Sequence, residues 1–215
     1  MSDKNPRLYL VTPLLDDIGT FPTALAAALG AGDVASLLMR GVPQGGAEAE
    51  RIIRAIAAST QPRGVALLVE GPPDLALRAG ADGAHIAGSG DALAAAIEKL
   101  SPDYIVGAGA LATRDDAMRA GEAGADYLLF GDEDAGGESP SLERLVERVG
   151  WWTEIFVTPC VALARTLDDV GPLARVGADF IMLGDFVWRD PRGPAAAVAD
   201  AAMRMSAKHL GEKVR

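Results

Sequence analysis

The chain has 215 residues and a formal net charge of −10 at pH 7, with a sequence pI near 4.7. This acidic balance argues against nucleic acid or an anionic membrane as partner, because both select basic patches. Hydrophobic residues make up 49% of the chain and aromatic residues only 5%. A core must therefore be packed mainly by Ala, Leu and Val, and the length fits one domain.

The N-terminal region shows no secretory signal, because its apolar run Leu8-Tyr-Leu-Val-Thr12 is too short. No apolar run approaches the roughly 18 residues of a membrane-spanning helix. We therefore expect a soluble, cytoplasmic protein. The single cysteine, Cys160, lies in an apolar run and is predicted to be a small buried side chain with no disulfide partner in the chain.

Eight short apolar runs predict eight buried strands of a parallel sheet. They cover residues 7–12, 34–39, 64–69, 83–87, 104–107, 127–131, 155–162 and 180–184. Between them, apolar spacing near 3.6 predicts helices at 20–29, 47–58, 73–79, 91–100, 114–123, 142–149, 167–176 and 193–208. Thr113 and Ser141 are predicted to cap the fifth and sixth of these helices.

The phrase Gly-Ala-Asp occurs three times, each time between a predicted helix and a predicted strand. The copies begin at Gly80, Gly124 and Gly177. Gly suits the left-handed residue that ends a helix, and the copies are about two βα units apart. The repeat and the eight alternating elements predict a single α/β domain over residues 1–215, a (β/α)8 TIM barrel, with residues 208–215 as a frayed tail.

Two features are predicted to lie away from the chemistry. In a TIM barrel the strand starts form the stability face, and the loops after the strands carry the active site. Trp151 and Trp152, placed between the sixth helix and the seventh strand, should therefore cover the base of the barrel or an interface. None of the lysines (Lys4, Lys99, Lys208 and Lys213) lies near a predicted strand end, which argues against a Schiff-base aldolase.

Several phrases, taken together, resemble the thiamine-phosphate synthase and TenI family over nearly the whole chain. They fall in the family's order and spacing: Leu8-Tyr-Leu-Val-Thr12, Ala81-Asp-Gly-Ala-His85-Ile, Ile105-Val-Gly107, Gly124-Ala-Asp-Tyr127 with Phe130-Gly131, Pro159-Cys-Val-Ala162 and Gly177-Ala-Asp179. The resemblance implies a TIM barrel that joins hydroxymethylpyrimidine pyrophosphate to thiazole phosphate and uses Mg²⁺.

The residues at the family's catalytic positions differ from its pattern. Of its Gln-x-Arg-x-Lys on strand two only Arg40 remains, and its Asn-Asp after strand three is Glu70-Gly71. Its Ser after strand five is Gly109, its Thr/Lys loop after strand six is the acidic run from Asp132 to Glu138, and its Gly-Gly after strand seven is Ala164-Arg165. Replacing cations by carboxylates costs about 1 kcal/mol or more per charge pair, so we predict a degenerate pyrophosphate site.

A remnant phosphate site is predicted between the ends of strands seven and eight. Its candidate residues are Arg40, Ala164, Arg165, Gly184 and Asp185. Backbone N–H groups after Ala164 and Gly184 would point at the anion, while the Asp185 carboxylate opposes it. The alternatives are that Arg40 pairs with a neighbouring loop acid and that Arg165 is an ordinary surface arginine.

Candidates for proton transfer or metal binding are few. His85, at the end of strand four, and Glu70 are candidate acid–base groups, although the resemblance favours a packing or loop-ordering role for His85. The only other histidine is His209. Asp91 is a candidate Mg²⁺ ligand, together with the acidic run Asp132, Glu133, Asp134 and Glu138; a solvated acidic loop is the alternative. Gly107-Ala-Gly109 does not make a dinucleotide fingerprint.

Three hypotheses for function follow. The first is a thiamine-phosphate synthase-like protein with weak or no parent activity. The second is a non-catalytic or regulatory barrel that binds a phosphate or thiazole-like ligand, and the third is an isomerase or lyase acting on another small acid. As partners we expect a small phosphorylated molecule, no nucleic acid and no membrane, with a homodimer left open.

Overall fold

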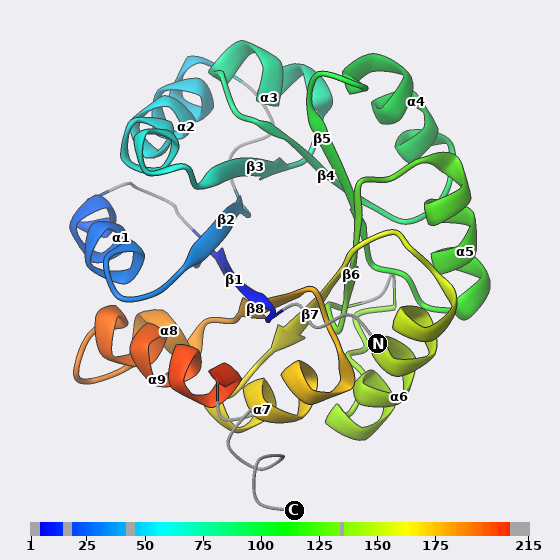
Figure 1. Cartoon of the computed structure of the whole chain (residues 1–215). Coiled ribbons are helices and arrows are strands. Elements are labelled where there is room, and N and C mark those ends of the chain that lie inside the picture. Colours follow the sequence, from blue (N-terminus) through cyan, green and yellow to red (C-terminus); the bar gives the residue numbers. More distant parts are fainter. Residues whose placement is uncertain (1–4, 15–18, 42–45, 134–135, 207–215) are drawn as a thin grey trace, which may run out of the picture.

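Eight parallel strands close into a barrel in chain order, surrounded by a ring of helices (Figure 1). The computed structural model describes residues 5–14, 19–41, 46–133 and 136–206. Neighbouring strands pair in parallel all the way round, and β1 pairs with both β2 and β8. The predicted (β/α)8 TIM barrel is thereby confirmed.

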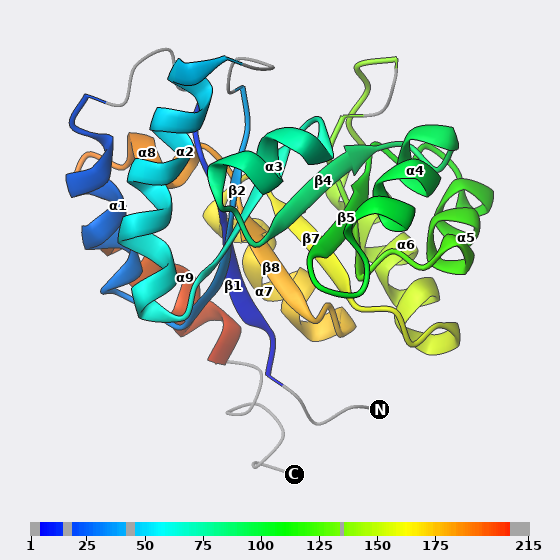
Figure 2. The ribbon, with the colours of Figure 1, turned by 90° about the horizontal axis from the view of Figure 1, so that it is seen from above.

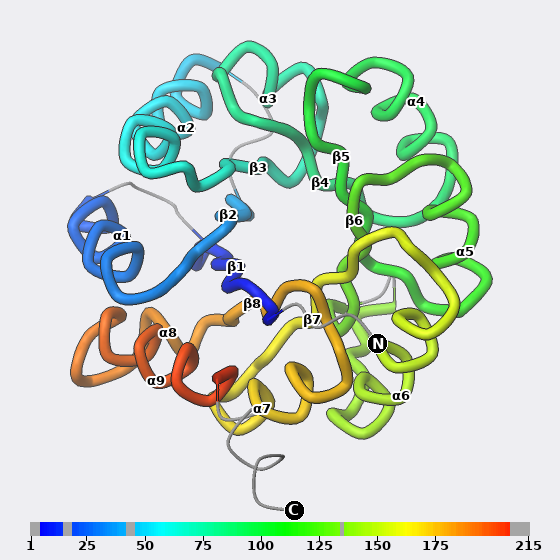
Figure 3. The backbone as a smooth tube through the Cα atoms, in the orientation of Figure 1, coloured from blue at the N-terminus to red at the C-terminus, as the bar shows by residue number. Residues whose placement is uncertain are grey.

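The strands are β1 (Arg7–Val11), β2 (Val34–Met39), β3 (Ala66–Glu70), β4 (Gly83–Ala87), β5 (Ile105–Gly109), β6 (Tyr127–Phe130), β7 (Cys160–Ala164) and β8 (Phe180–Leu183). The helices are α1 (Phe21–Leu29), α2 (Ala47–Thr60), α3 (Pro73–Ala79), α4 (Asp91–Leu100), α5 (Arg114–Ala123), α6 (Leu142–Ile155), α7 (Leu167–Val176), α8 (Phe186–Arg189) and α9 (Pro194–Ser206), with a 3-10 turn η1 (Gln61–Arg63) after α2. Figures 2 and 3 show these helices outside the strands from two directions.

The sixth unit differs most from the prediction. α6 continues to Ile155, so the predicted strand at 155–162 is wrong over its first five residues and β7 begins only at Cys160. Trp151 and Trp152 therefore lie in the last turns of α6, not after the helix. Trp152 is buried, stacks on Phe156 and donates its indole N–H to the Thr158 carbonyl. This burial keeps the helix intact past Gly150, where the sequence suggested its end.

The remaining differences between the predicted and the observed elements are mostly small. The short helix α8 was not predicted, because four residues are too few for a periodic pattern. Thr113 and Ser141 cap α5 and α6 as predicted, and Cys160 is buried with a free thiol. The predicted frayed tail at 208–215 lies outside the described residues. Within the described part of the chain, no helix is long and apolar enough to cross a membrane.

The three Gly-Ala-Asp phrases fasten neighbouring strands at the base of the barrel. The Asp82 carboxylate accepts the Leu67 amide at 2.7 Å, Asp126 accepts Val106 N at 2.8 Å, and Asp179 accepts Cys160 N at 2.9 Å. Each Asp amide also donates to the carbonyl of the same partner residue. Gly80, Gly124 and Gly177 end the preceding helices in the left-handed region. Every copy therefore joins the start of an even-numbered strand to the odd-numbered strand before it. We call these three aspartates, Asp82, Asp126 and Asp179, the aspartate clamps.

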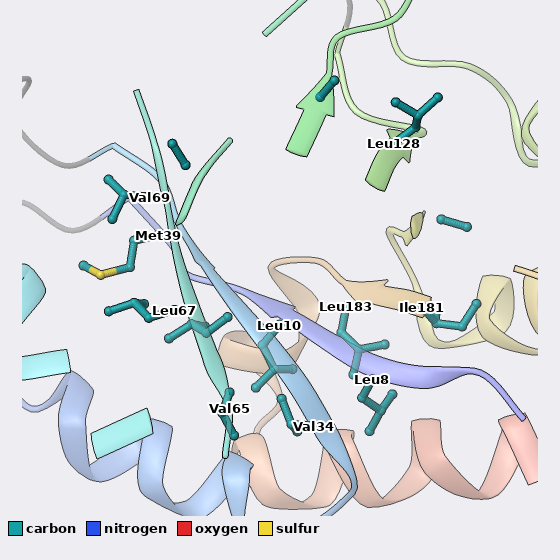
Figure 4. Packing of buried hydrophobic residues seen from close by; sticks show 14 of the residues in the cluster. Leu8, Leu10, Val34, Met39, Val65, Leu67, Val69, Leu128, Ile181 and Leu183 are labelled. Carbon is teal, nitrogen blue, oxygen red and sulfur yellow. The ribbon is translucent and has the colours of Figure 1, made fainter. Parts of the chain in front are cut away.

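Two apolar layers result from the alternation of side chains along the strands. Outward-facing residues such as Leu10, Leu67 and Leu183 pack under the helices (Figure 4). Inward-facing residues fill the barrel itself and form a smaller cluster around Tyr9, Leu68, Tyr127, Val161 and Met182. The inner layer forms a floor, above which the strand ends are free to carry polar groups.

Beyond Ile105, strand β5 is bare on its inward face. A Cβ atom at Gly107 would overlap the ring of Tyr127, and a Cβ at Gly109 would lie 2.5 Å from His85 Nε2. The two glycines thus leave room inside the barrel for the larger rings from β4 and β6.

Loss of one aspartate clamp should destabilise the barrel. We expect Asp82→Ala to lower the free energy of unfolding by about 1–3 kcal/mol, because it leaves the amide of the buried Leu67 without an acceptor. Asp82→Asn should recover part of the loss, since an amide oxygen still accepts. Urea unfolding measures both, with Asp103→Ala, an exposed carboxylate after α4, as the control; equal effects of Asp82→Ala and Asp103→Ala would contradict the clamp.

The bare face of β5 predicts a second effect on stability. Gly107→Ala should cost about 1–3 kcal/mol, because the added methyl group must displace the Tyr127 ring in a packed interior. Gly30→Ala, where a Cβ would make only an ordinary contact at 3.5 Å, is the matched control and should change stability by less than about 1 kcal/mol. Thermal unfolding of the two variants tests this, and equal melting temperatures would count against it.

Candidate functional site

A cavity of about 790 Å³ opens at the carboxyl ends of the strands. This is the face on which TIM barrels carry their chemistry. We call it the mouth cavity; its lining comprises Leu14, Arg40, Glu70, His85, Ala87, Gly88, Gly109, Ala110, Asp132, Glu133, Ser139, Leu163, Arg165, Gly184 and Asp185. Four of the five predicted phosphate-binding residues line it, and Ala164 does not. Both predicted acid–base groups, Glu70 and His85, line it as well.

Arg40 and Asp185 face one another across the mouth. Arg40 follows β2, and its amide donates to Thr12 Oγ1 at 3.1 Å. Its guanidinium lies 3.9 Å from Asp185 Oδ1, a long ion pair. Arg40 Nε and Asp185 Oδ1 are both buried and make no hydrogen bond within the described residues. A buried donor and acceptor left this way favour a ligand that bonds to them.

Arg165 is engaged in holding a loop. Its guanidinium donates to the carbonyls of Gly131 at 2.6 Å and Pro140 at 2.9 Å, on either side of the β6–α6 loop. It does not pair with Asp185 in the described structure. The Asp185 carboxylate instead approaches Arg40 and, at 3.4 Å, Arg189.

Of the backbone donors expected at the phosphate locus, those after Ala164 are occupied. Gly184 N donates to the Ala164 carbonyl at 2.9 Å. The amides of Arg165 and Thr166 both donate to Asp169 Oδ2 at 2.9 Å, which caps α7. Asp169 thus takes up the two amides after Ala164, and a phosphate role for Ala164, Arg165 and Gly184 stays a prediction.

Three titratable groups with shifted pKa values surround the cavity floor. Burial lowers the pKa of His85 to about 4, with the positive charge of Arg40 adding to the effect. Burial raises the pKa of Asp132 to about 6, and it also raises that of Glu70. At neutral pH the imidazole is therefore uncharged. Such a mixture of shifted groups in one cavity is typical of functional sites.

Asp132 lies beside an unusual stretch of backbone. Its Oδ2 accepts the amide of Ala110 at 2.6 Å, and Ala110 has φ +53°, the one positive φ at a non-glycine position in the described residues. An alanine pays about 1–2 kcal/mol for this left-handed conformation. The carboxylate therefore holds a strained turn at the end of β5, directly at the cavity wall.

The structure does not assemble the predicted Mg²⁺ ligands. Asp91 is the exposed first residue of α4 and is absent from the cavity lining. Of the acidic run, Asp132 and Glu133 line the cavity, Glu138 lines a neighbouring smaller pocket, and Asp134 lies outside the described residues. Over the described ranges, no group of three or more His, Cys, Asp or Glu side chains could hold a metal ion.

Tyr127 was missed by the sequence reasoning, although it contacts His85. Its hydroxyl lies 2.8 Å from His85 Nδ1 and 2.9 Å from the Tyr9 hydroxyl. Strand alternation could have found the contact: Tyr9, His85 and Tyr127 all occupy inward positions of their strands. The apolar surroundings of both tyrosines hid this signal.

The family model described as thiamine monophosphate synthase matches residues 8–186. The chain belongs to this family. A thiamine-phosphate synthase of Rhodospirillum centenum is 41% identical over 199 residues, covering 90% of this chain and 95% of the relative. One from Hyphomonas neptunium is 38% identical, covering 89% of this chain and 90% of the relative. The resemblance found in the sequence is thus confirmed.

Solved structures agree on the fold. A thiamine phosphate pyrophosphorylase from Pyrococcus furiosus superposes with a TM-score of 0.75 at 22% identity, covering 95% of this chain and 98% of that one. A 3-hexulose-6-phosphate synthase from Salmonella typhimurium gives 0.71 at 18% identity, covering 94% and 100%. At such identities the likeness shows the fold alone.

The raised pKa of Asp132 predicts a pH-dependent penalty. The carboxylate is ionised in the folded state only above about pH 6, whereas an ordinary Asp ionises near 3.9. Folding therefore becomes less favourable as the pH rises through this window. We expect Asp132→Asn, whose amide oxygen can still accept from Ala110, to raise the unfolding free energy at pH 7 by about 1–3 kcal/mol. The gain should vanish at pH 3.5 in urea titrations, and a pH-independent effect would refute the assignment.

Proposed function

We propose that the chain serves in thiamine biosynthesis, as a family member whose mouth cavity binds a small phosphorylated molecule. By this proposal it joins hydroxymethylpyrimidine pyrophosphate to thiazole phosphate slowly or not at all. The family and its 41% identical relative support the pathway. The charge balance of the cavity supports the loss of activity.

That charge balance is the observation that carries the proposal. The cavity lining contains four carboxylates, Glu70, Asp132, Glu133 and Asp185, against the two guanidinium groups of Arg40 and Arg165. Arg165 is committed to two carbonyls, which leaves Arg40, itself in a long ion pair with Asp185, as the one other cation among the described lining residues. A pyrophosphate group needs several donors and cations, or a carboxylate-held Mg²⁺. Neither set is assembled by the lining residues that the structure describes.

A turnover measurement tests the loss of activity. Purified protein is incubated with both substrates and Mg²⁺, and thiamine phosphate is quantified, with an active thiamine-phosphate synthase as the positive control. We expect a rate at least about 100-fold below 1 s⁻¹, an ordinary enzymatic rate. Turnover near 1 s⁻¹ would show that the carboxylate-rich mouth does not prevent the reaction.

Ligand binding at Arg40 is tested separately by thermal unfolding. Thiamine phosphate or inorganic phosphate at about 100 times its Kd should stabilise the fold by about 2.7 kcal/mol if it binds only the folded state. Arg40→Ala should abolish the shift, whereas Arg63→Ala, an exposed arginine in η1, should leave it unchanged. Asp185→Ser should enlarge it by removing the carboxylate beside Arg40. Equal shifts in all variants would exclude Arg40 from the site.

A second candidate function is isomerase or lyase chemistry on another small acid. It is favoured by one observation: His85 and Asp132 approach the same point of the cavity wall, beside Gly109. Deuterium uptake from solvent into candidate carboxylic acids, followed by NMR with Asp132→Asn as control, would reveal such proton transfer. No uptake above the control removes this candidate.

A further inference from the structure

Three polar side chains form a connected path up the inside of the barrel. The hydroxyls of Tyr9 and Tyr127 are 2.9 Å apart, and the Tyr127 hydroxyl is 2.8 Å from His85 Nδ1. Tyr9 and Tyr127 line a small cavity of about 220 Å³ near the strand starts, and His85 lines the mouth cavity. The path therefore connects the base of the barrel with its functional face.

The rings are held in place by packing. His85 and Tyr127 stack with centroids 5.6 Å apart and an interplanar angle of 19°. Tyr9 meets Tyr127 edge to face at 5.7 Å. All three side chains are buried, and the missing side chains of Gly107 and Gly109 provide their space. Because packing fixes the rings, the path can differ only in which atoms of the two hydroxyls and the imidazole carry and donate the protons.

The number of hydroxyl protons determines which group donates and which accepts along the path. Burial raises the pKa of both tyrosines, so each hydroxyl keeps its single proton. Among the described residues, the Tyr9 hydroxyl has no hydrogen-bond partner besides Tyr127. Its proton is therefore best placed toward Tyr127, because a buried donor without an acceptor is costly. Tyr127 accepts this hydrogen bond through its hydroxyl oxygen and donates its own O–H to His85 Nδ1.

The other end of the path favours the same direction. A Cβ atom built on Gly109 would lie 2.5 Å from His85 Nε2 and 2.6 Å from Asp132 Oδ2, so both atoms border the same small space at the cavity wall. A carboxylate favours an N–H group nearby over a nitrogen lone pair. The opposite direction would leave the Tyr9 proton without a protein acceptor and place a lone pair next to Asp132.

We propose that Tyr9 and Tyr127 act as positioning residues that fix His85 as the Nε2–H tautomer, so that it offers the mouth cavity a neutral hydrogen-bond donor beside Asp132. The ligand this donor fits is one with an acceptor, a ring nitrogen or a carbonyl oxygen, directed at the wall between β4 and β6. Proton acceptance in the cavity then falls to Asp132 or Glu70, not to His85.

The test is nitrogen NMR of the full-length chain labelled with 15N-histidine at pH 7. The chain has two histidines, and His209→Gln assigns the remaining resonances to His85. In the native chain Nδ1 should show the unprotonated, pyridine-type shift and Nε2 the protonated, pyrrole-type shift, with at least about tenfold preference for this tautomer. A protonated Nδ1, or shifts averaged between two tautomers, would overturn the proposal.

Two variants distinguish a tautomer set by the hydrogen-bond path from Tyr9 through Tyr127 to His85, here called the relay, from one set by ring packing alone. Tyr127→Phe keeps the ring but removes the donor, so the Nδ1 resonance should move downfield toward that of a nitrogen without a hydrogen bond. Tyr9→Phe leaves Tyr127 able to donate and should give a clearly smaller shift. Unchanged Nδ1 in folded Tyr127→Phe would refute the relay. If that variant does not fold, the native tautomer and the Tyr9→Phe spectrum still decide the question.

Discussion

The aspartate clamps are the constraint on which the rest of the barrel depends. A parallel barrel holds together only if every strand keeps its register, and a slip by one residue would turn each inward side chain outward. Asp82, Asp126 and Asp179 each make two bonds to one residue on the preceding strand. The carboxylate accepts that residue's amide, and the backbone amide of the Asp donates to that residue's carbonyl. The register of the pairs β3–β4, β5–β6 and β7–β8 is thus fixed at the base, away from the mouth.

Fixed register at the base allows variation at the mouth. Because inward positions are set, Gly107 and Gly109 face the rings of Tyr127 and His85, and the strand ends present Arg40, Glu70 and Asp132 to one cavity. Of these mouth side chains, only Asp132 bonds the backbone at the end of a neighbouring strand within the described residues, at the Ala110 amide. The barrel framework can therefore accommodate different sets of charges at its mouth. The acceptors of the Arg165 and Gly184 amides, Asp169 and the Ala164 carbonyl, belong to that framework.

Much of the fold could be predicted from the sequence, because hydrophobic period and the Gly-Ala-Asp repeat are local signals. The extent of α6 could not be predicted, since it depends on the burial of Trp152 against residues far from it in the sequence, such as Phe130. At the site, the strand ends correctly placed Arg40, Glu70 and His85 at the mouth. The pairing of Arg40 with Asp185 and the use of Arg165 by two carbonyls depend on side-chain directions across the barrel, which no local pattern encodes.

We expect anion binding in this chain to depend on the Arg40 side chain, because the backbone donors after β7 are already occupied. A crystal structure grown in phosphate tests it most directly. The account predicts an ordered anion bonded to the Arg40 guanidinium, with Asp185 turned from it and Asp169 still capping α7. An anion held instead by the amides of Arg165, Thr166 and Gly184, with Asp169 displaced, would contradict it.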